Sequence, residues 1–186
     1  MKKDFPILKK KSIFSGKAIH VVKWEMKAPD GKTFIRELIQ HPGAAVAIPV
    51  LPGERFVMVS QHRAAVNGWL LEFPAGTLEP GEKPRVCAHR ELIEEAGFRA
   101  GKLTNLVDFF PAPGISMEHM YLYLATDLRP AKGTLDADEF LEVKIVPRKA
   151  LEKKIKQGKI KDGKTIIGFF YYQLLKQAGK LRGLTS

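Results

Sequence analysis

Residues Gly76–Phe98 read GTLEPGEKPRVCAHRELIEEAGF, and this stretch decides how the rest of the chain is interpreted. Its second half predicts a helix over Lys83–Ala96, because Pro84 suits a first helical turn and Gly97 suits a left-handed C-terminal cap. Just upstream, the apolar run Trp69–Phe73 predicts a strand that ends at a Pro-Ala-Gly turn. We therefore expect a strand, a glycine-containing loop and a helix in succession.

Three glutamates crowd the C-terminal half of the expected helix. Glu91 and Glu95 are four residues apart and share a face, and Glu94 lies beside them, four residues after Arg90. Like charges at this spacing repel, so we expect a cation between Glu91 and Glu95. Clustered carboxylates are hard oxygen donors that suit Mg²⁺ or Mn²⁺. The alternative is an acidic helix face that is merely solvated.

The spacing of the stretch resembles the Nudix box, Gly-x5-Glu-x7-Arg-Glu-U-x-Glu-Glu-x-Gly-U, where U is apolar. Gly76 is followed by five residues and Glu82, then by seven residues and the run Arg90–Phe98, so every defined position is met. The resemblance implies a Nudix hydrolase. It also implies an α+β fold, in which an α/β/α sandwich with a mixed sheet carries additional N-terminal antiparallel strands.

The same resemblance implies roles for the residues of the box. Glu91 and Glu95, helped by the carbonyl of Ala75, would bind Mg²⁺ (or Mn²⁺), as two or three ions that bridge a diphosphate. Glu94 would be a further ligand or an acid/base helper. Arg90 would orient the carboxylates through bidentate hydrogen bonds.

Beyond the box, the chain is similar to the ADP-ribose pyrophosphatase and nucleoside diphosphate sugar hydrolase branch, from about residue 12 to about residue 177. That branch implies substrate contacts by Arg36 and Arg63, and a homodimer whose N-terminal strands cross to the partner. Salt bridges with Glu37 or Glu72 are the alternative role for the two arginines. The similarity is carried by Arg36-Glu37, Gln61-His62-Arg63, Trp69–Gly76, Pro113-Gly114 and Glu118.

Two further segments bear on the substrate and on the catalytic base. The Asp-x-Lys formed by Asp162 and Lys164 resembles GDP-mannose hydrolases, which implies that Lys164 meets a substrate phosphate and that Asp162 positions it. The alternative is a helix N-cap by Asp162 with Lys164 exposed. In the acidic loop, where relatives often read Asp-Glu-Asp-Glu, Ala137 replaces the first glutamate, so Glu139 is the residue expected to order the attacking water or to bind a further metal ion.

The remaining pattern predicts a sheet flanked by helices, with residues 1–42 as an N-terminal strand extension that forms the dimer and 43–186 as the Nudix domain. The extension contains a hairpin of two strands, Lys17–Lys27 and Thr33–Gln40. Other strands are predicted at Ala44–Val50, Arg55–Gln61, Leu103–Phe110, Met120–Ala125 and Phe140–Pro147, and two more helices at Arg148–Gln157 and Lys164–Ala178.

Composition narrows the function classes. The 186 residues carry a net charge of +11, and the excess lies in residues 1–11 and 148–186. Lysine dominates both runs without interleaved aromatic residues, so nucleic acid is an unlikely partner. The lone Cys87 excludes a disulfide framework or a multi-cysteine zinc site and is expected to face the core. No membrane span or signal peptide is predicted, which makes the cytoplasm the default compartment.

These observations predict a Mg²⁺-dependent hydrolase that cleaves the pyrophosphate of nucleoside diphosphate sugars, such as GDP-mannose or ADP-ribose, to a nucleoside monophosphate and a sugar phosphate. One alternative is an ADP-ribose-specific pyrophosphatase with the same mechanism. Others are a catalytically weak Nudix domain that binds RNA through its basic ends, and an RNA-decapping Nudix enzyme.

Overall fold

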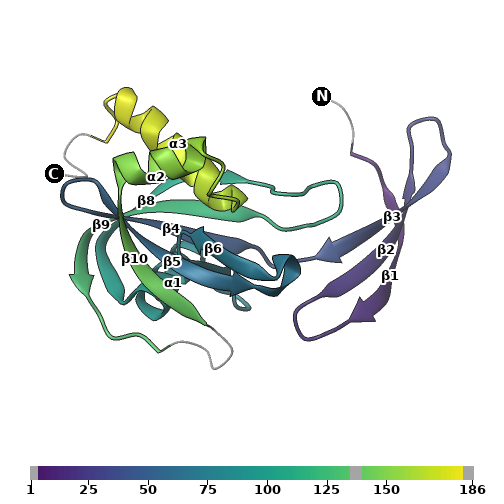
Figure 1. The fold of residues 1–186 in the computed structure, drawn as a ribbon. Coiled ribbons are helices and arrows are strands. Elements are labelled where there is room, and N and C mark those ends of the chain that lie inside the picture. The colour runs from purple at the N-terminus through teal and green to yellow at the C-terminus, as the bar shows by residue number, and fades with distance from the viewer. Residues whose placement is uncertain (1–3, 135–139, 182–186) are drawn as a thin grey trace. The chain divides into compact units, whose positions relative to one another are not determined.

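A three-stranded sheet and a seven-stranded sheet organise the chain, whose computed structural model describes residues 4–134 and 140–181 (Figure 1). Each sheet belongs to its own unit. The unit of the small sheet contains a segment from the middle of the chain, which is held to the strand ending at Gln40 by hydrogen bonds between Ile39 and Ile115 and between Met117 and Ile39. The two units comprise Met1–Gly43 with Phe110–His119, and Ala44–Phe109 with Met120–Ser186.

The first unit is an antiparallel sheet in the order β1 (Ile7–Ser15), β2 (His20–Lys27) and β3 (Thr33–Gln40). The predicted hairpin of β2 and β3 is confirmed, and Gly31 takes the positive φ of 87° that its turn requires. Strand β1 was not predicted. All nine of its residues are exposed, so it lacks the alternation of apolar and polar residues that marks a half-buried strand.

The second unit holds the mixed sheet that the sequence predicted. Its main path runs β10-β5-β4-β9-β8, with β6 added to β5 and β7 added to β4. The β4–β9 pair is parallel and the other pairs are antiparallel. The strands are β4 (Ala44–Leu51), β5 (Arg55–Arg63), β6 (Gly68–Glu72), β7 (Ala75–Thr77), β8 (Phe98–Phe109), β9 (Met120–Pro130) and β10 (Leu141–Pro147), and a short 3₁₀ helix, η1 (Ala64–Val66), joins β5 to β6.

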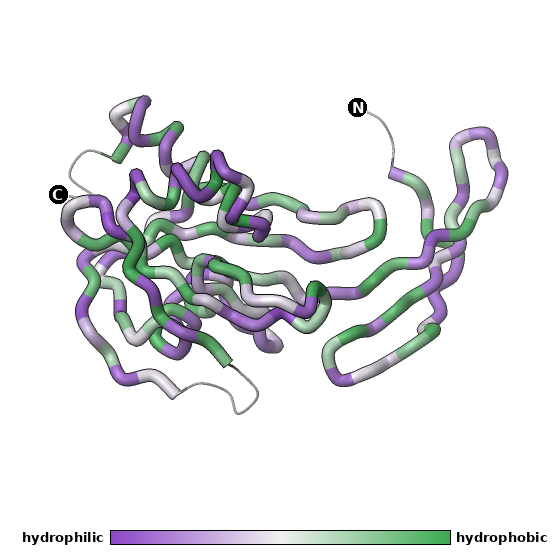
Figure 2. Tube along the Cα trace, viewed as in Figure 1, coloured by the Kyte–Doolittle hydropathy of each residue, from purple (hydrophilic) through white to green (hydrophobic). Residues whose placement is uncertain are grey.

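Helices cover both faces of this sheet, with α1 (Pro84–Ala96) on one side and α2 (Arg148–Lys156) and α3 (Gly163–Gln177) on the other (Figure 1). Strand β4 serves both layers, because alternate residues of a strand point to opposite faces. Its Val46, Ile48 and Val50 pack with α2 and α3, whereas Ala45 and Ala47 pack with α1. Apart from Pro49, every residue of the strand is on the hydrophobic side of the scale used in Figure 2. Within the described residues, no helix is long and apolar enough to cross a membrane.

An aromatic cluster holds the end of β6 against α3. The ring of Phe56 makes edge contacts with Phe73, Phe169 and Tyr172 at centroid distances of 5.5, 6.0 and 5.2 Å. Beside it, the Phe73 N–H donates to Thr165 Oγ1 at 2.9 Å, which joins the start of α3 to the residue after β6. Because these groups are fully buried, the loop that follows Phe73 starts from a fixed position.

Candidate active site

Helix α1 begins soon after strand β7, and backbone geometry fixes both of its ends. Pro84 occupies the first turn, and Gly97 closes the helix at a φ of 70° while its N–H donates to the Ile93 carbonyl at 3.1 Å. The helix predicted over Lys83–Ala96 is thus confirmed, with Lys83 as its N-cap residue. The strand, loop and helix therefore present the motif side chains from rigid elements.

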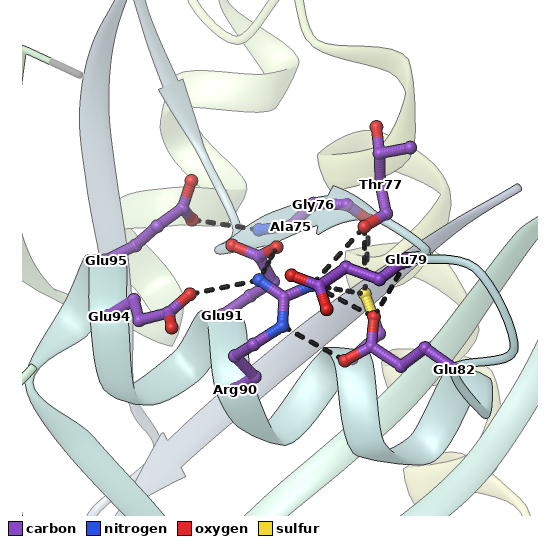
Figure 3. A network of polar contacts seen from close by, with 10 residues as sticks. Ala75, Gly76, Thr77, Glu79, Glu82, Arg90, Glu91, Glu94 and Glu95 are labelled. Atoms are coloured by element: carbon purple, nitrogen blue, oxygen red, sulfur yellow. Dashed lines mark hydrogen bonds and ion pairs between the residues drawn. The ribbon is translucent and has the colours of Figure 1, made fainter. Parts of the chain in front are cut away.

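Arg90 is the centre of the polar network on α1 (Figure 3). Its guanidinium donates from Nε to Glu82 Oε1 at 3.0 Å, and from Nη1 to Glu91 Oε1 at 2.6 Å and to Glu94 Oε2 at 3.0 Å. Nη2 also donates to the Thr77 carbonyl at 3.3 Å. Hydrogen bonds to Glu82 and the nearby carboxylate charges raise the pKa of Arg90, and hydrogen bonds from Arg90 lower the pKa of Glu82. The arrangement gives three carboxylates fixed orientations.

Glu91 and Glu95 each accept a hydrogen bond from a separate donor of the protein. Arg90 joins Glu91 to Glu94, whereas Glu95 Oε2 accepts the Ala75 N–H at 2.9 Å. Both carboxylates are mostly buried, with residue exposures of 7% for Glu91 and 3% for Glu95. Each carboxylate is thus oriented by its own protein donor.

Glycine at position 76 lets the Glu91 carboxylate lie against the backbone of β7. A Cβ at this position would come 1.8 Å from Glu91 Oε1, far inside van der Waals contact. In this chain the first glycine of the motif is therefore required for a steric reason. Cys87, the small residue between the loop and the core, is fully buried as expected, and this burial raises the pKa of its thiol to about 12.

A cavity of about 330 Å³ opens beside these side chains. Carboxylates of α1 lie along one part of its wall, and β5 contributes Arg63 and Gln61. Gln61 Oε1 is the one buried side-chain N or O atom, within 4–134 and 140–181, that has no hydrogen-bond partner. The lining residues are Gln61, Arg63, Ala75, Gly76, Thr77, Glu79, Arg90, Glu91, Glu94 and Glu95. Here called the acidic pocket, this cavity collects most of the motif residues.

The donors at the acidic pocket are of the kind that a hard divalent cation prefers. The carboxylates of Glu91, Glu94 and Glu95 and the carbonyl of Ala75 are all oxygen donors. In the described part of the chain, no three acidic, histidine or cysteine side chains stand close enough together to form a ready metal cluster. Arg90 already bonds to Glu91 and Glu94, so a bound cation would compete with its guanidinium for these carboxylates.

A second polar cluster, here called the Glu72 network, connects β5 and β6 to α3. Arg63 donates from Nε and Nη2 to the two carboxylate oxygens of Glu72 at 2.9 and 2.7 Å. Lys164 Nζ bonds to Glu72 Oε2 and, at 3.0 Å, to Asp162 Oδ1. Burial disfavours the charged Glu72, but bonds from Arg63 and the Lys164 charge outweigh it and hold its pKa below the ordinary value. The alternative salt bridge of Arg63 with Glu72 is thus present.

Asp162 is the N-cap of α3, because its Oδ2 accepts the Thr165 N–H at 2.9 Å. The N-cap alternative is confirmed, but the exposure of Lys164 that accompanied it is wrong. The Lys164 side chain is only 7% exposed, since it turns inward to Glu72. No sequence signal links Glu72 to this lysine, because the two lie 92 positions apart and only the packing of α3 brings them together.

Of the other two candidate residues, Arg36 belongs to the first unit and Glu139 lies outside the described residues. Arg36 lies on β3, where its Nη1 donates to the Ile35 carbonyl at 2.9 Å and its guanidinium lies 4.6 Å from the centre of the Phe34 ring. Ala137 lies outside the described residues as well. The structure thus brings together Ala75, Arg90, Glu91, Glu94 and Glu95 at one cavity, and Arg63 lines that cavity from the Glu72 network.

Comparison with known proteins agrees with this geometry. The NUDIX domain profile matches residues 41–167. The chain is 38% identical over 167 residues to the ADP-ribose pyrophosphatase of Bacillus subtilis (strain 168), covering 89% of this chain and 90% of the relative. It is also 38% identical over 170 residues to the methanol dehydrogenase activator of Bacillus methanolicus, covering 90% and 91%.

A solved structure described as an ADP compounds hydrolase shares the fold. Its TM-score to this structure is 0.83, at 22% sequence identity, over 96% of this chain and 97% of that one. The domain match over residues 41–167 and the two relatives aligned along nearly the whole chain show the family. The chain therefore belongs to the Nudix hydrolases.

Proposed function

We propose that this Nudix hydrolase cleaves the diphosphate of nucleoside diphosphate sugars, ADP-ribose and GDP-mannose among them, to a nucleoside monophosphate and a sugar phosphate. The observation that carries the proposal is the acidic pocket, where the carboxylates of α1 and the guanidinium of Arg63 line one cavity. Carboxylates suit a cation and arginine suits phosphate oxygens, so the cavity offers complementary groups for a metal-bound diphosphate. The ADP-ribose pyrophosphatase of B. subtilis supports ADP-ribose as the first substrate to test.

Nudix hydrolases generally use divalent metal ions, and we assign Mg²⁺ or Mn²⁺, as two or three ions, to this pocket. Glu91, Glu95 and the Ala75 carbonyl are the proposed ligands. A cation held by such ligands neutralises charge on phosphoryl oxygens and lowers the pKa of an attacking water. Arg90 fixes the orientation of the carboxylates, and Glu94 is the proposed further ligand or acid/base helper.

The remaining assignments concern the substrate and the water. Arg63, whose side chain is 40% exposed, is proposed to bind the diphosphate from β5, and Arg36 is proposed to contact the base, ribose or diphosphate. Glu139 is proposed to order the attacking water, in place of the glutamate that relatives carry where this chain has Ala137. No side chain of a covalent mechanism is required, because water is the nucleophile.

We also propose that residues 1–42 form an extension through which two copies assemble. Several large apolar side chains on β1 and β3 of this unit are exposed, and clustered exposed apolar residues often mark protein–protein contacts. They are Ile7, Leu8, Ile13, Phe14 and Ile35, with exposures between 38% and 57%. A second copy of the chain is the partner proposed to cover them.

Turnover of a substrate panel tests the activity. Purified wild type is incubated with ADP-ribose, GDP-mannose or UDP-glucose, with Mg²⁺ or with EDTA, and product monoesters are measured as phosphate after phosphatase treatment. Glu95→Gln is the matched variant, because its amide oxygen still accepts the Ala75 N–H while its charge is lost. We expect turnover only with metal, and a fall in kcat on the order of 100-fold or more, since residues that merely orient metal ligands already cost about 10–100-fold.

The control is Glu142→Gln, an exposed glutamate on β10 whose carboxylate pairs with Lys144, and its turnover should match wild type. Preference for ADP-ribose alone would select the ADP-ribose-specific pyrophosphatase, whereas broad turnover would support the nucleoside diphosphate sugar hydrolase. Full activity of Glu95→Gln, or turnover in EDTA, would contradict the assigned site.

A further inference from the structure

The Glu72 carboxylate is shared between two cations. It is almost fully buried, at 1% exposure, and both of its oxygens accept hydrogen bonds from Arg63. The oxygen that accepts Arg63 Nη2 also binds Lys164 Nζ. A carboxylate with one guanidinium would form a neutral pair, so the ammonium of Lys164 adds a positive charge that the Arg63–Glu72 pair alone does not have.

The two cations differ in what they can reach. The Arg63 side chain is 40% exposed and lines the acidic pocket, where the charge of Glu95 also acts on it. The Lys164 side chain is 7% exposed, and the described residues that line the pocket do not include it. Lys164 is thus placed to act on a ligand through Arg63 rather than by contact.

Two carboxylates, those of Glu72 and Asp162, fix the position of Lys164. Asp162 accepts a bond from Lys164 Nζ at 3.0 Å, and it also caps α3 through the Thr165 N–H, so part of its charge is directed to the helix N-terminus. Thr165 Oγ1 in turn accepts the Phe73 N–H, one residue after Glu72. The Phe73–Thr165 hydrogen bond joins the end of β6 to the start of α3. It therefore keeps the carboxylate of Glu72 close to the ammonium of Lys164.

We propose that Lys164 is a positioning residue, which shares the Glu72 carboxylate so that the guanidinium of Arg63 stays fixed in direction and is less neutralised by Glu72 on the side that faces a substrate diphosphate. Without Lys164, Glu72 would pair with Arg63 alone, beside a pocket whose wall already carries Glu79, Glu91, Glu94 and Glu95. A diphosphate would then be attracted less strongly to Arg63. The inference rests on the proposed function, and it assigns Lys164 a role behind the site rather than in contact with a phosphate.

A double-mutant cycle between Lys164 and Arg63 tests this assignment. Lys164→Met, Arg63→Ala and the double variant are compared with wild type in KM and kcat for ADP-ribose, and in Kd for ADP-ribose by titration calorimetry. We expect Lys164→Met to raise KM and Kd on the order of 10-fold, the size of a lost charge-assisted hydrogen bond, while kcat changes less than about 2-fold. In the Arg63→Ala background, Lys164→Met should have almost no further effect on KM or Kd, because the arginine through which Lys164 acts is absent.

Two further variants separate positioning from folding. Lys176→Met removes another lysine of α3, one that pairs with the partly buried carboxylate of Glu54. This variant should leave KM and Kd unchanged. Lys164→Arg keeps the charge and should recover most of the lost affinity. Where Lys164→Met does not fold, Lys164→Gln, which removes the charge but keeps a polar side chain, takes its place in the cycle with the same expected result.

The outcomes are distinct. Losses that multiply in the Lys164→Met, Arg63→Ala double variant would show that Lys164 contacts the phosphate itself or supports the fold alone, and would overturn the inference while leaving the proposed function intact. A wild type that neither cleaves nor binds ADP-ribose or the other panel substrates would overturn both.

Discussion

At the scale of single residues, one missing methyl group allows the carboxylates of α1 to lie where they do. Gly76 leaves room for Glu91, whose Oε1 would be 1.8 Å and whose Cδ would be 2.1 Å from an added Cβ. The same oxygen accepts Arg90 Nη1 at 2.6 Å, so displacing Glu91 would also loosen the guanidinium that holds Glu94 and Glu82. The glycine is therefore coupled to the whole polar network through one contact.

We predict that Gly76→Ala lowers kcat on the order of 100-fold and destabilises the fold by about 1–3 kcal/mol, the usual cost of forcing extra atoms into a packed site. Turnover and urea unfolding measure the two effects. Gly163→Ala is the control, because a Cβ there meets nothing within 4 Å, and it should behave as wild type. Unchanged activity of Gly76→Ala would mean that Glu91 does not need its present position.

The sequence located the motif side chains but not their partners. Spacing alone placed Arg90 within reach of Glu94, because residues four apart on a helix are neighbours. It could not show that Glu95 turns to the Ala75 N–H, since that contact depends on how β7 docks on the helix. The burial of Lys164 was missed for the same reason: its partner Glu72 comes from a distant strand.

At the scale of secondary structure elements, predictions succeeded where local patterns were strong. Helix α1 and the hairpin of β2 and β3 carry clear terminal and turn signals, and both are confirmed. Strand β1 carries lysines at successive positions and has no buried face, and β7 is three residues long within a segment that reads as a turn. Both form because a neighbouring strand supplies hydrogen-bond partners, which periodicity does not reveal.

The Glu72 network joins three elements, so its titration should appear in the stability of the fold. The pKa of Glu72 is lowered in the folded protein, so its stabilising effect is present above the unfolded pKa of about 4.3 and is lost as the pH falls through the lower folded value. We predict that Glu72→Gln costs about 3–5 kcal/mol at pH 7, because it leaves Arg63 and Lys164 without their shared carboxylate.

Urea unfolding of wild type and Glu72→Gln between pH 7 and pH 2 measures this effect. The difference in unfolding free energy should be constant down to about pH 4.3 and shrink below it as the wild-type carboxyl is protonated. Glu142→Gln, in which an exposed ion pair with Lys144 is removed, should change the profile little. A difference that does not depend on pH would mean that packing, rather than charge, accounts for the loss.

At the scale of the whole molecule, both units expose large apolar side chains, but among the residues that the structure describes only the second unit also buries apolar clusters. In the second unit, the sheet and its helices bury two apolar clusters. In the first unit, β1 has no buried residue, and Leu8 and Phe14 are 52% and 57% exposed. Helix α3 of the second unit also exposes Phe170, at 51%. Because both Phe14 and Phe170 are exposed, a charged substitution at each of them is needed to show which face joins two copies.

We predict that wild type has twice the 20.8 kDa mass of one chain when it is measured by size-exclusion chromatography with light scattering. Phe14→Glu places a charge on the face proposed to pair and should shift the mass to that of a single chain, since a buried unpaired carboxylate is costly. Phe170→Glu introduces the same charge at nearly equal exposure on α3 and should leave the dimer intact. If Phe170→Glu dissociates the dimer and Phe14→Glu does not, the second unit forms the interface and the assignment of residues 1–42 is wrong. A wild type of single-chain mass would instead mean that the apolar residues of β1 meet no second copy at all.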